Sequence, residues 1–283
     1  MTTLKREDFV NSNEVRWCPG CGDYAILSAL QKLMPELGLP PERQVFVSGI
    51  GCSGRLPYYM NTFGFHTIHG RAPAVATGLK TMRDDVMVWL ITGDGDGFSI
   101  GGNHLIHCLR RNININILLV NNQVYGLTKG QFSPTSPIGQ VTKTSPLGVE
   151  ASPLNPIKMA LAAGATFVAR ALDKDPAHLG EVLKAAALHE GVSFVEIYQD
   201  CHIFNAGAFD DFALKANRGT NTNVLKAGEH DAHDFMKAME LANHTFPENP
   251  VPIGIFYQVV KPVMRFGAKV EKTVEDLAQL YRK

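Results

Sequence analysis

The amino-acid sequence predicts an α/β fold in which a parallel sheet carries helices on both faces. From about residue 23 to residue 200, short apolar runs alternate with segments whose apolar residues recur at helical spacing, a pattern typical of strand–helix–strand units. Glycine-rich and polar motifs directly follow several of these runs, and parallel sheets bind ligands beyond the carboxyl ends of their strands. With 283 residues, 45% apolar and 19% charged, the chain can bury a substantial core.

The expected elements alternate regularly along the chain. Helices are expected at residues 24–34, 72–82, 99–111, 155–163 and 176–189, and strands at residues 44–48, 86–92, 113–120, 166–169 and 193–198. Asp23 stands at the N-cap position of the first helix, where a carboxylate accepts from free backbone N–H groups. A stretch rich in Ser, Thr, Pro and Gly runs from residue 128 to residue 153, and a loop of this length in a compact domain is usually functional.

The alternation weakens after Cys201. Residues 202–250 are polar and contain glycine, residues 252–260 have the composition of a further strand, and residues 273–282 are expected to form a terminal helix. We therefore divide the chain into an α/β domain, residues 1–205, and a C-terminal extension, residues 206–283, that packs on the domain or on a partner.

Charge and hydropathy exclude several classes of protein. Lys plus Arg and Asp plus Glu both total 27, so no excess of positive charge favours nucleic acid or an anionic membrane surface. No apolar run reaches the roughly 18–20 residues of a membrane span, and the first residues lack the apolar core of a signal peptide. We expect a cytoplasmic protein without nucleic-acid or membrane partners, in which thiols stay reduced.

Two polar motifs follow successive strands at crossover spacing. Gly93-Asp94-Gly95 comes after residues 86–92, and Asn121-Asn122 comes after residues 113–120. If the two strands are neighbours, a carboxylate and an amide oxygen project into one crevice, and such hard oxygen ligands suit Mg²⁺ with phosphate oxygens. A dinucleotide fingerprint would need G-x-G-x-x-G, and an EF-hand loop would need a Glu at its twelfth position. The first motif alone would equally suit a turn with solvated aspartates.

The cysteines form the second constellation. Cys18 and Cys21 are a C-x-x-C pair, Cys52 lies in a glycine-rich turn, and Cys201 follows the strand at 193–198. Four thiolates can hold zinc or a [4Fe–4S] cluster, and their spacing does not distinguish these metals. A redox dithiol and inert buried thiols are the other interpretations. Cys108, inside a predicted helix, is expected to be a small core residue.

Five motifs in a shared order resemble the β subunit of 2-oxoacid:ferredoxin oxidoreductases. Gly93-Asp94-Gly95 with Asn121-Asn122 is similar to the thiamine-diphosphate-binding motif, and the others lie at residues 17–22, 49–55, 69–72 and 125–131. The resemblance covers residues 14–205 strongly and the remainder loosely. It implies that residues 1–205 bind thiamine diphosphate, Mg²⁺ and one [4Fe–4S] cluster.

The resemblance also implies site residues. The cluster ligands would be Cys18, Cys21, Cys52 and Cys201, and the Mg²⁺ ligands would be Asp94, Asn122 and the backbone carbonyl of Val124. The residues expected to line the cofactor site are Ile50, Gly51, Cys52, Ser53, His69, Gly93, Asp94, Gly95, Asp96, Asn122, Val124, Tyr125, Gly126 and Leu127.

The activity implied is the coenzyme A-dependent oxidative decarboxylation of a 2-oxoacid, or its reversal, with electrons passed to ferredoxin. Thiamine enzymes carry an activating glutamate in a separate pyrimidine-binding domain. Because the sequence shows no second α/β module, we expect activity only with an α subunit, as a heterodimer or an α2β2 assembly.

Substrate contacts are expected from three residues. Residues 57–67 resemble 2-oxoglutarate-type β subunits more than pyruvate-type ones. The fork of Arg55 suits the distal carboxylate of 2-oxoglutarate, and His69 and Lys129 are further candidates for substrate or cofactor contacts; an ordinary structural or solvated role is the alternative for each. The competing functions are pyruvate oxidation, a non-redox thiamine-dependent decarboxylase subunit with structural zinc, and a non-catalytic zinc-stabilised subunit.

Overall fold

The computed structural model describes residues 4–212, 224–226, 230–245 and 249–265. The strands are β1 (Gln44–Ser48), β2 (Phe63–His66), β3 (Met87–Gly93), β4 (Asn116–Asn121), β5 (Val124–Tyr125), β6 (Gln131–Phe132), β7 (Phe167–Leu172), β8 (Ser193–Tyr198), β9 (Val224–Lys226) and β10 (Val251–Gln258). Eight of them form one sheet in the order β2-β1-β3-β4-β8-β7-β10-β9, while β5 and β6 pair as a separate antiparallel ribbon.

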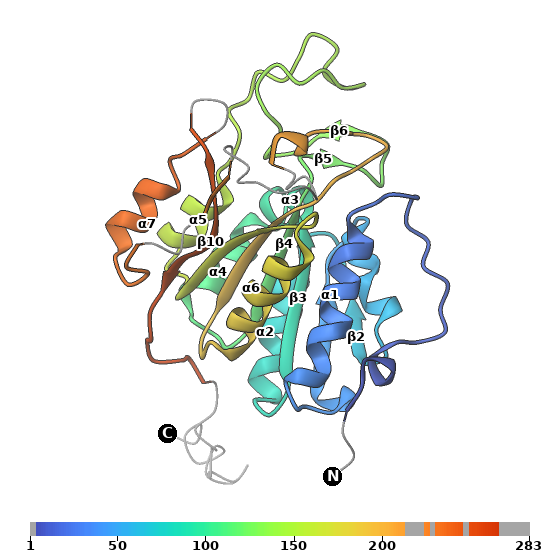
Figure 1. The fold of residues 1–283 in the computed structure, drawn as a ribbon, viewed down its shortest axis with the longest axis vertical. Helices are drawn as coiled ribbons and strands as arrows, with labels where there is room; N and C mark the ends of the chain where they lie inside the picture. The colour runs from blue at the N-terminus through green and yellow to red at the C-terminus, as the bar shows by residue number, and fades with distance from the viewer. Residues whose placement is uncertain (1–3, 213–223, 227–229, 246–248, 266–283) are drawn as a thin grey trace, which may run out of the picture.

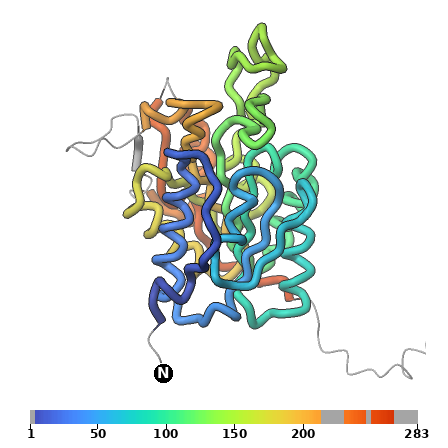
Figure 2. Tube along the Cα trace, turned by 90° about the vertical axis from the view of Figure 1, so that its right-hand side faces the viewer, coloured from blue at the N-terminus to red at the C-terminus, as the bar shows by residue number. Residues whose placement is uncertain are grey.

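Helices cover both faces of the sheet (Figure 1). They are α1 (Asp23–Glu36), α2 (Ala72–Met82), α3 (Asp94–Phe98), α4 (Gly102–Arg110), α5 (Pro156–Ala162), α6 (Pro176–Leu188) and α7 (Phe235–Leu241), with short 3₁₀ turns η1 (Arg6–Phe9), η2 (Pro41–Arg43), η3 (Ser53–Tyr59) and η4 (Asp210–Phe212). Figure 2 shows that the chain between β6 and α5 projects beyond the body of the domain.

The sheet separates two hydrophobic cores because successive side chains of a strand point to opposite faces. On β4, Ile117 and Leu119 join the core under α2, α4, α5 and α7. Leu118 and Val120 of the same strand join the core under α1 and α6. Residues of β4 are buried throughout, which explains why the sequence shows a continuous apolar run rather than an alternating one.

The predicted class, a parallel sheet with helices on both faces, is confirmed. All pairings from β2 across to β7 are parallel. Strand β10 pairs antiparallel with β7, and β9 pairs parallel with β10, so these two strands run against the others. Cys108 is buried in α4, as expected. The edge strand β2 was not expected, since its exposed residues Phe63–His66 lack a core-facing pattern.

Two local expectations at helix starts were wrong. Asp23 is the first residue of α1, not its N-cap; Gly22 takes that position, and no side chain caps the helix. The helix expected to begin at Ser99 is preceded by the separate helix α3, which begins at Asp94 directly after β3. The acidic motif that follows β3 therefore lies on a helical turn.

The described part of the C-terminal extension adds strands β10 and β9 to the sheet. Strand β10 pairs with β7, and α7 packs against the core under α5. The terminal helix expected at residues 273–282 lies outside the described residues. In the part of the chain that is described, no helix combines the length and apolar character that a membrane crossing requires.

Candidate functional site

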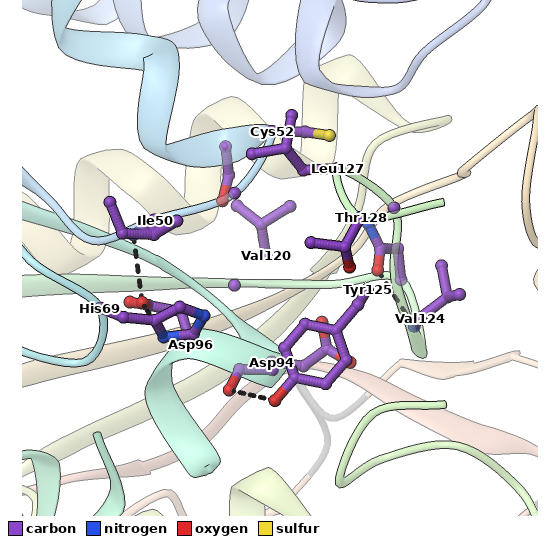
Figure 3. A pocket seen from close by; sticks show the side chains of 16 residues that line it. Ile50, Cys52, His69, Asp94, Asp96, Val120, Val124, Tyr125, Leu127 and Thr128 are labelled. Atoms are coloured by element: carbon purple, nitrogen blue, oxygen red, sulfur yellow. Dashed lines mark hydrogen bonds and ion pairs between the residues drawn. The ribbon is translucent and has the colours of Figure 1, made fainter. Parts of the chain in front are cut away.

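The site lies where β1, β3 and β4 end, at one edge of the sheet. Gly93 pairs with Val120, so the residues that follow β3 and β4 emerge side by side. Every residue expected to line the cofactor site borders a single cavity of about 90 Å³. Val120 and Thr128 also line this cavity. Figure 3 shows Asp94, Asp96, Val124 and Tyr125 around this cavity, which we call the diphosphate cavity after the ligand that the sequence resemblance implies there.

Asp94 is held by hydroxyl groups from the long loop after β6. Its side chain is buried, and its Oδ2 accepts from Ser133 Oγ at 2.5 Å and from Thr135 Oγ1 at 2.7 Å. Thr135 Oγ1 also lies 2.9 Å from Asn121 Oδ1. Burial raises the pKa of Asp94, and the two hydroxyl donors oppose part of that rise. The hydroxyls therefore stabilise the carboxylate form that a metal ligand requires.

Asp96 organises the loops on the other side of the diphosphate cavity. Its Oδ1 accepts from the backbone N–H groups of Ile50 (3.1 Å) and Gly70 (2.8 Å), and its Oδ2 accepts from Thr92 Oγ1 (2.7 Å). His69 Nδ1 also lies 2.9 Å from Asp96 Oδ1. Because Ile50 follows β1 and Gly70 follows β2, Asp96 holds these two turns together. Both of its carboxylate oxygens are engaged in these contacts.

Asn122 faces the same cavity from the end of β4. Its Oδ1 accepts from the backbone N–H of Val124 at 3.2 Å, and its Nδ2 donates to Gln199 Oε1 at 2.9 Å. The hydroxyl of Tyr125 donates to the carbonyl of Gly95 at 2.9 Å. A Cβ at Gly95 would lie 2.3 Å from the Tyr125 ring, so only glycine permits this packing.

The four cysteines line a neighbouring cavity of about 240 Å³, the cysteine cavity. Trp17 Nε1 donates to the carbonyl of Cys52 at 2.7 Å, and this hydrogen bond connects the segment that carries Cys18 and Cys21 to the turn after β1. Gly126 borders both cavities. The position of a Cβ on Gly126 lies 3.4 Å from Cys201 Sγ and 3.7 Å from Cys52 Sγ. Cys52, Asn122 and Leu127 border both cavities as well, so these residues and Gly126 form a shared wall between the two sites.

Burial favours the protonated form of three of the four candidate thiols. Burial, followed by the negative charge of Asp23, raises the pKa of Cys52 to about 12 and raises the pKa of Cys21 above its usual range. Burial also raises the pKa of Cys201. A metal that binds these sulfurs must therefore displace protons.

The two basic candidates lie at the cysteine cavity rather than the diphosphate cavity. Arg55 and Lys129 line it together with the cysteines, and Arg55 Nε donates to the Tyr59 hydroxyl at 2.9 Å. His69 is the one candidate that borders the diphosphate cavity. Within the described ranges, no three His, Cys, Asp or Glu side chains come close enough to hold one metal ion.

Comparison with known proteins identifies the family. Residues 49–197 match the thiamine pyrophosphate enzyme, C-terminal TPP binding domain. The chain is 40% identical over 253 residues to the β subunit of a 2-oxoacid:ferredoxin oxidoreductase from Saccharolobus solfataricus, with 86% of this chain and 81% of that protein covered. The chain belongs to this family of β subunits.

Two further relatives carry more specific names. The 2-oxoglutarate oxidoreductase subunit KorB of Mycobacterium tuberculosis is 61% identical over 222 residues, which are 78% of this chain and 59% of that protein's length. The structure of a 2-oxoglutarate:ferredoxin oxidoreductase from Magnetococcus marinus, with 2-oxoglutarate, coenzyme A and succinyl-CoA bound, matches with a TM-score of 0.89 and 36% identity. That match covers 100% of this chain and 98% of the other.

Three residues of this β subunit that contact the predicted site residues were not predicted from the sequence. Ser133 and Thr135 lie in the loop that was expected to be functional, but the sequence offers no sign that their hydroxyls reach Asp94. Gln199 was also missed, because a single Gln after a strand carries no motif. Its burial at 1% exposure and its contacts with Asn122 and Cys21 appear only in the fold.

Proposed function

We propose that the chain is the β subunit of a thiamine-diphosphate-dependent 2-oxoglutarate:ferredoxin oxidoreductase. With an α subunit, it would catalyse the coenzyme A-dependent oxidative decarboxylation of 2-oxoglutarate to succinyl-CoA and CO₂, or the reverse carboxylation, in the cytoplasm. Electrons would pass through a [4Fe–4S] cluster to ferredoxin. The observation that carries the proposal is the shared wall at Gly126, which puts Cys52 and Cys201 next to the diphosphate cavity.

The donor set of the diphosphate cavity fits Mg²⁺. Asp94, Asn122 and Val124 all line this cavity, and they would offer a carboxylate, an amide oxygen and a backbone carbonyl. Mg²⁺ prefers such oxygen ligands and commonly completes its shell with phosphate oxygens. Asp94, Asn122 and Val124 would therefore hold the ion that ties thiamine diphosphate to the protein. Asp96 has a different task, because its carboxylate is engaged with Ile50, Gly70 and Thr92.

The cysteine cavity fits an iron–sulfur cluster. All four candidate thiols line it, and each comes from a different turn or strand end except the pair Cys18 and Cys21. Four thiolates are the usual ligand set of a [4Fe–4S] cluster. A cluster in this cavity would lie beside the site at which electrons would be released, and that position would give the four cysteines a function.

The chain supplies only part of the chemistry. Bound thiamine diphosphate acts as an electron sink for loss of CO₂ from a 2-oxoacid. The residues of this chain bind and orient the diphosphate end, through Asp94 and Asn122 and through the turn that Asp96 holds in place. The activating glutamate must come from the α subunit, since the described residues form a single sheet with its helices and one small ribbon. The isolated β subunit is therefore inactive.

The 2-oxoglutarate preference rests on the names of the relatives and on Arg55. The mycobacterial relative and the Magnetococcus structure are both named for 2-oxoglutarate. Arg55 lines the cysteine cavity together with Cys52, which borders both cavities, and its guanidinium can pair with a distal carboxylate.

The proposal is tested on protein purified anaerobically with its α subunit. We expect brown protein with a broad absorption near about 400 nm, as iron–sulfur clusters give, and ferredoxin reduction that depends on both 2-oxoglutarate and coenzyme A. A colourless complex with stoichiometric zinc would contradict the redox function. Decarboxylation without ferredoxin reduction would favour the non-redox alternative.

A further inference from the structure

Gln199 connects the diphosphate cavity to the cysteine cavity. It directly follows β8, is only 1% exposed, and its backbone N–H donates to the carbonyl of Asn121. Its side-chain Oε1 accepts from Asn122 Nδ2 at 2.9 Å. Its Nε2 donates to Cys21 Sγ at 3.3 Å and to the carbonyl of Asp200 at 2.7 Å. One buried amide therefore contacts a proposed Mg²⁺ ligand at one end and a proposed cluster ligand at the other.

The orientation of this amide follows from its partners. A backbone carbonyl can only accept a hydrogen bond, so the group of Gln199 that faces the Asp200 carbonyl must be the NH₂. The same NH₂ faces Cys21 Sγ, which accepts. The oxygen of Gln199 is left to face Asn122, whose own NH₂ must then point toward Gln199.

The orientation of Gln199 in turn sets that of Asn122. With its NH₂ directed at Gln199, Asn122 presents its oxygen to the N–H of Val124 on the side of the diphosphate cavity. Only the oxygen of an amide can bind a metal ion. A flipped Asn122 would direct two donors toward the cation and would leave the oxygen of Gln199 facing another oxygen. Gln199 therefore selects the rotamer of Asn122 that can bind Mg²⁺.

At its other end, Gln199 lies beside the sulfur of Cys21, which would be a thiolate ligand of the cluster. Hydrogen bonds to ligand sulfurs are among the factors that set the reduction potential of an iron–sulfur cluster. A donor stabilises the more negative, reduced form more than the oxidised form. The N–H of Gln199 should therefore keep the potential less negative than it would be without this contact.

We propose that Gln199 is a positioning residue that orients Asn122 for Mg²⁺ and adjusts the cluster through Cys21, so that both cofactors depend on one side chain. The inference rests on the proposed function, because it requires both cofactors to be present. It adds to that function a physical link between the site that releases electrons and the group that accepts them.

The test compares two variants of the complete complex with its α subunit. Gln199→Met keeps the length and burial of the side chain but removes both hydrogen-bonding ends. We expect the Kd for thiamine diphosphate at fixed Mg²⁺ to rise about 10–100-fold, as for other residues that orient metal ligands. The midpoint potential of the cluster, measured by EPR-monitored titration, should become more negative.

Gln199→Glu separates the two roles. In either protonation state it keeps an oxygen that accepts from Asn122, so the Kd should rise less than about threefold. When ionised it has no donor for Cys21, and its negative charge should move the midpoint potential further down. A Kd for Gln199→Glu as weak as that of Gln199→Met would overturn the role in orienting Asn122.

The matched control is Gln44→Met. Gln44 is also fully buried, and its Nε2 donates to the carbonyls of Met34 and Leu39, but it begins β1 at the opposite edge of the sheet. We expect Gln44→Met to lower the melting temperature while Kd and potential stay at wild-type values. Equal shifts in Kd and midpoint potential in Gln199→Met and Gln44→Met would show that Gln199 contributes only to general stability, and would overturn the inference.

Measurements on the wild-type complex distinguish a failure of the role of Gln199 from a failure of the proposed function. If it binds thiamine diphosphate and shows the cluster signal, but Gln199→Met changes neither Kd nor potential, the inference is wrong and the function stands. If the wild-type complex shows neither cofactor, the proposed function itself is wrong.

Discussion

Replacing Thr135 with valine should selectively weaken the Mg²⁺ site. The hydroxyl of this buried residue donates to Asp94 Oδ2 at 2.7 Å and lies 2.9 Å from Asn121 Oδ1. Valine has nearly the same shape but no donor. Burial already raises the pKa of Asp94, and Thr135 is one of the groups that oppose the rise. Thr135→Val should therefore raise that pKa further and reduce the fraction of Asp94 that is ionised.

The magnitude follows from the charge on the acceptor. A hydrogen bond to an ionised group contributes about 1.5–3 kcal/mol, and about 1.4 kcal/mol corresponds to a tenfold change in Kd. The Kd for Mg²⁺-dependent thiamine diphosphate binding, measured by calorimetry on the complex, should rise about 10–100-fold. Because metal binding requires the deprotonated carboxylate, the deficit should shrink as the pH is raised.

Thr166→Val is the control for the effect of losing a buried hydroxyl hydrogen bond away from the site. Thr166 is also buried, and its hydroxyl donates to Asn112 Oδ1 at 2.8 Å, but it immediately precedes β7, at the end of the sheet away from the site. Both variants should lose stability in urea, whereas only Thr135→Val should lose affinity. A Kd within about twofold of wild type for Thr135→Val, or an equal loss in Thr166→Val, would refute the role of Thr135 at Asp94.

Three further predictions concern other parts of the molecule. Arg55→Ala should raise the apparent KM for 2-oxoglutarate more than that for pyruvate in steady-state assays, and equal effects would remove the assigned role. Gly126→Ala puts a methyl group 3.4 Å from Cys201 Sγ and 3.7 Å from Cys52 Sγ, which are ordinary contact distances, so the variant without bound iron should keep its melting temperature. A cluster held by these sulfurs would meet the methyl group, so iron per chain should fall, and full iron content would contradict a cluster beside Gly126. Burial lowers the pKa of His189 below its usual value of 6.5. As the pH falls below about 6.5, the unfolded chain therefore binds a proton at His189 more readily than the folded chain does. The free energy of unfolding should then decrease, whereas above about pH 6.5 His189 causes no such loss. His189→Gln should flatten this part of the melting temperature–pH profile, and an unchanged slope would be evidence against it.

Much of the fold and of the diphosphate cavity could be predicted because the signals are local. A buried strand of a parallel sheet is a continuous apolar run, as in β3 and β4, and the residues after it must emerge at the carboxyl edge. Gly93-Asp94-Gly95 and Asn121-Asn122 therefore had to meet once β3 and β4 were neighbours. The residues expected around the cofactor come from such strand ends, and the structure brings them to one cavity.

Two features could not be predicted in this way: the edge strand β2, and the position of Asp23 inside α1 with its raised pKa. Strand β2 exposes all its residues, so its pairing with β1 leaves no periodic signal. Asp23 has the residue type and position of an N-cap, yet the path of the chain from Cys21 places it inside α1, where burial raises its pKa to about 7. Both outcomes depend on long-range packing that overrides a local preference.

By itself, the sequence determined the α/β class, the order of most elements and the strand ends at which chemistry was expected, since each is encoded within a few consecutive residues. Only the tertiary structure decided which side chains support those ends. Thr135 reaches Asp94 across 41 residues, and Gln199 reaches Cys21 across 178. The physical reason is that a hydrogen bond needs its two atoms within about 3 Å, a condition that residue types and spacing do not contain and that only the packed sheet imposes.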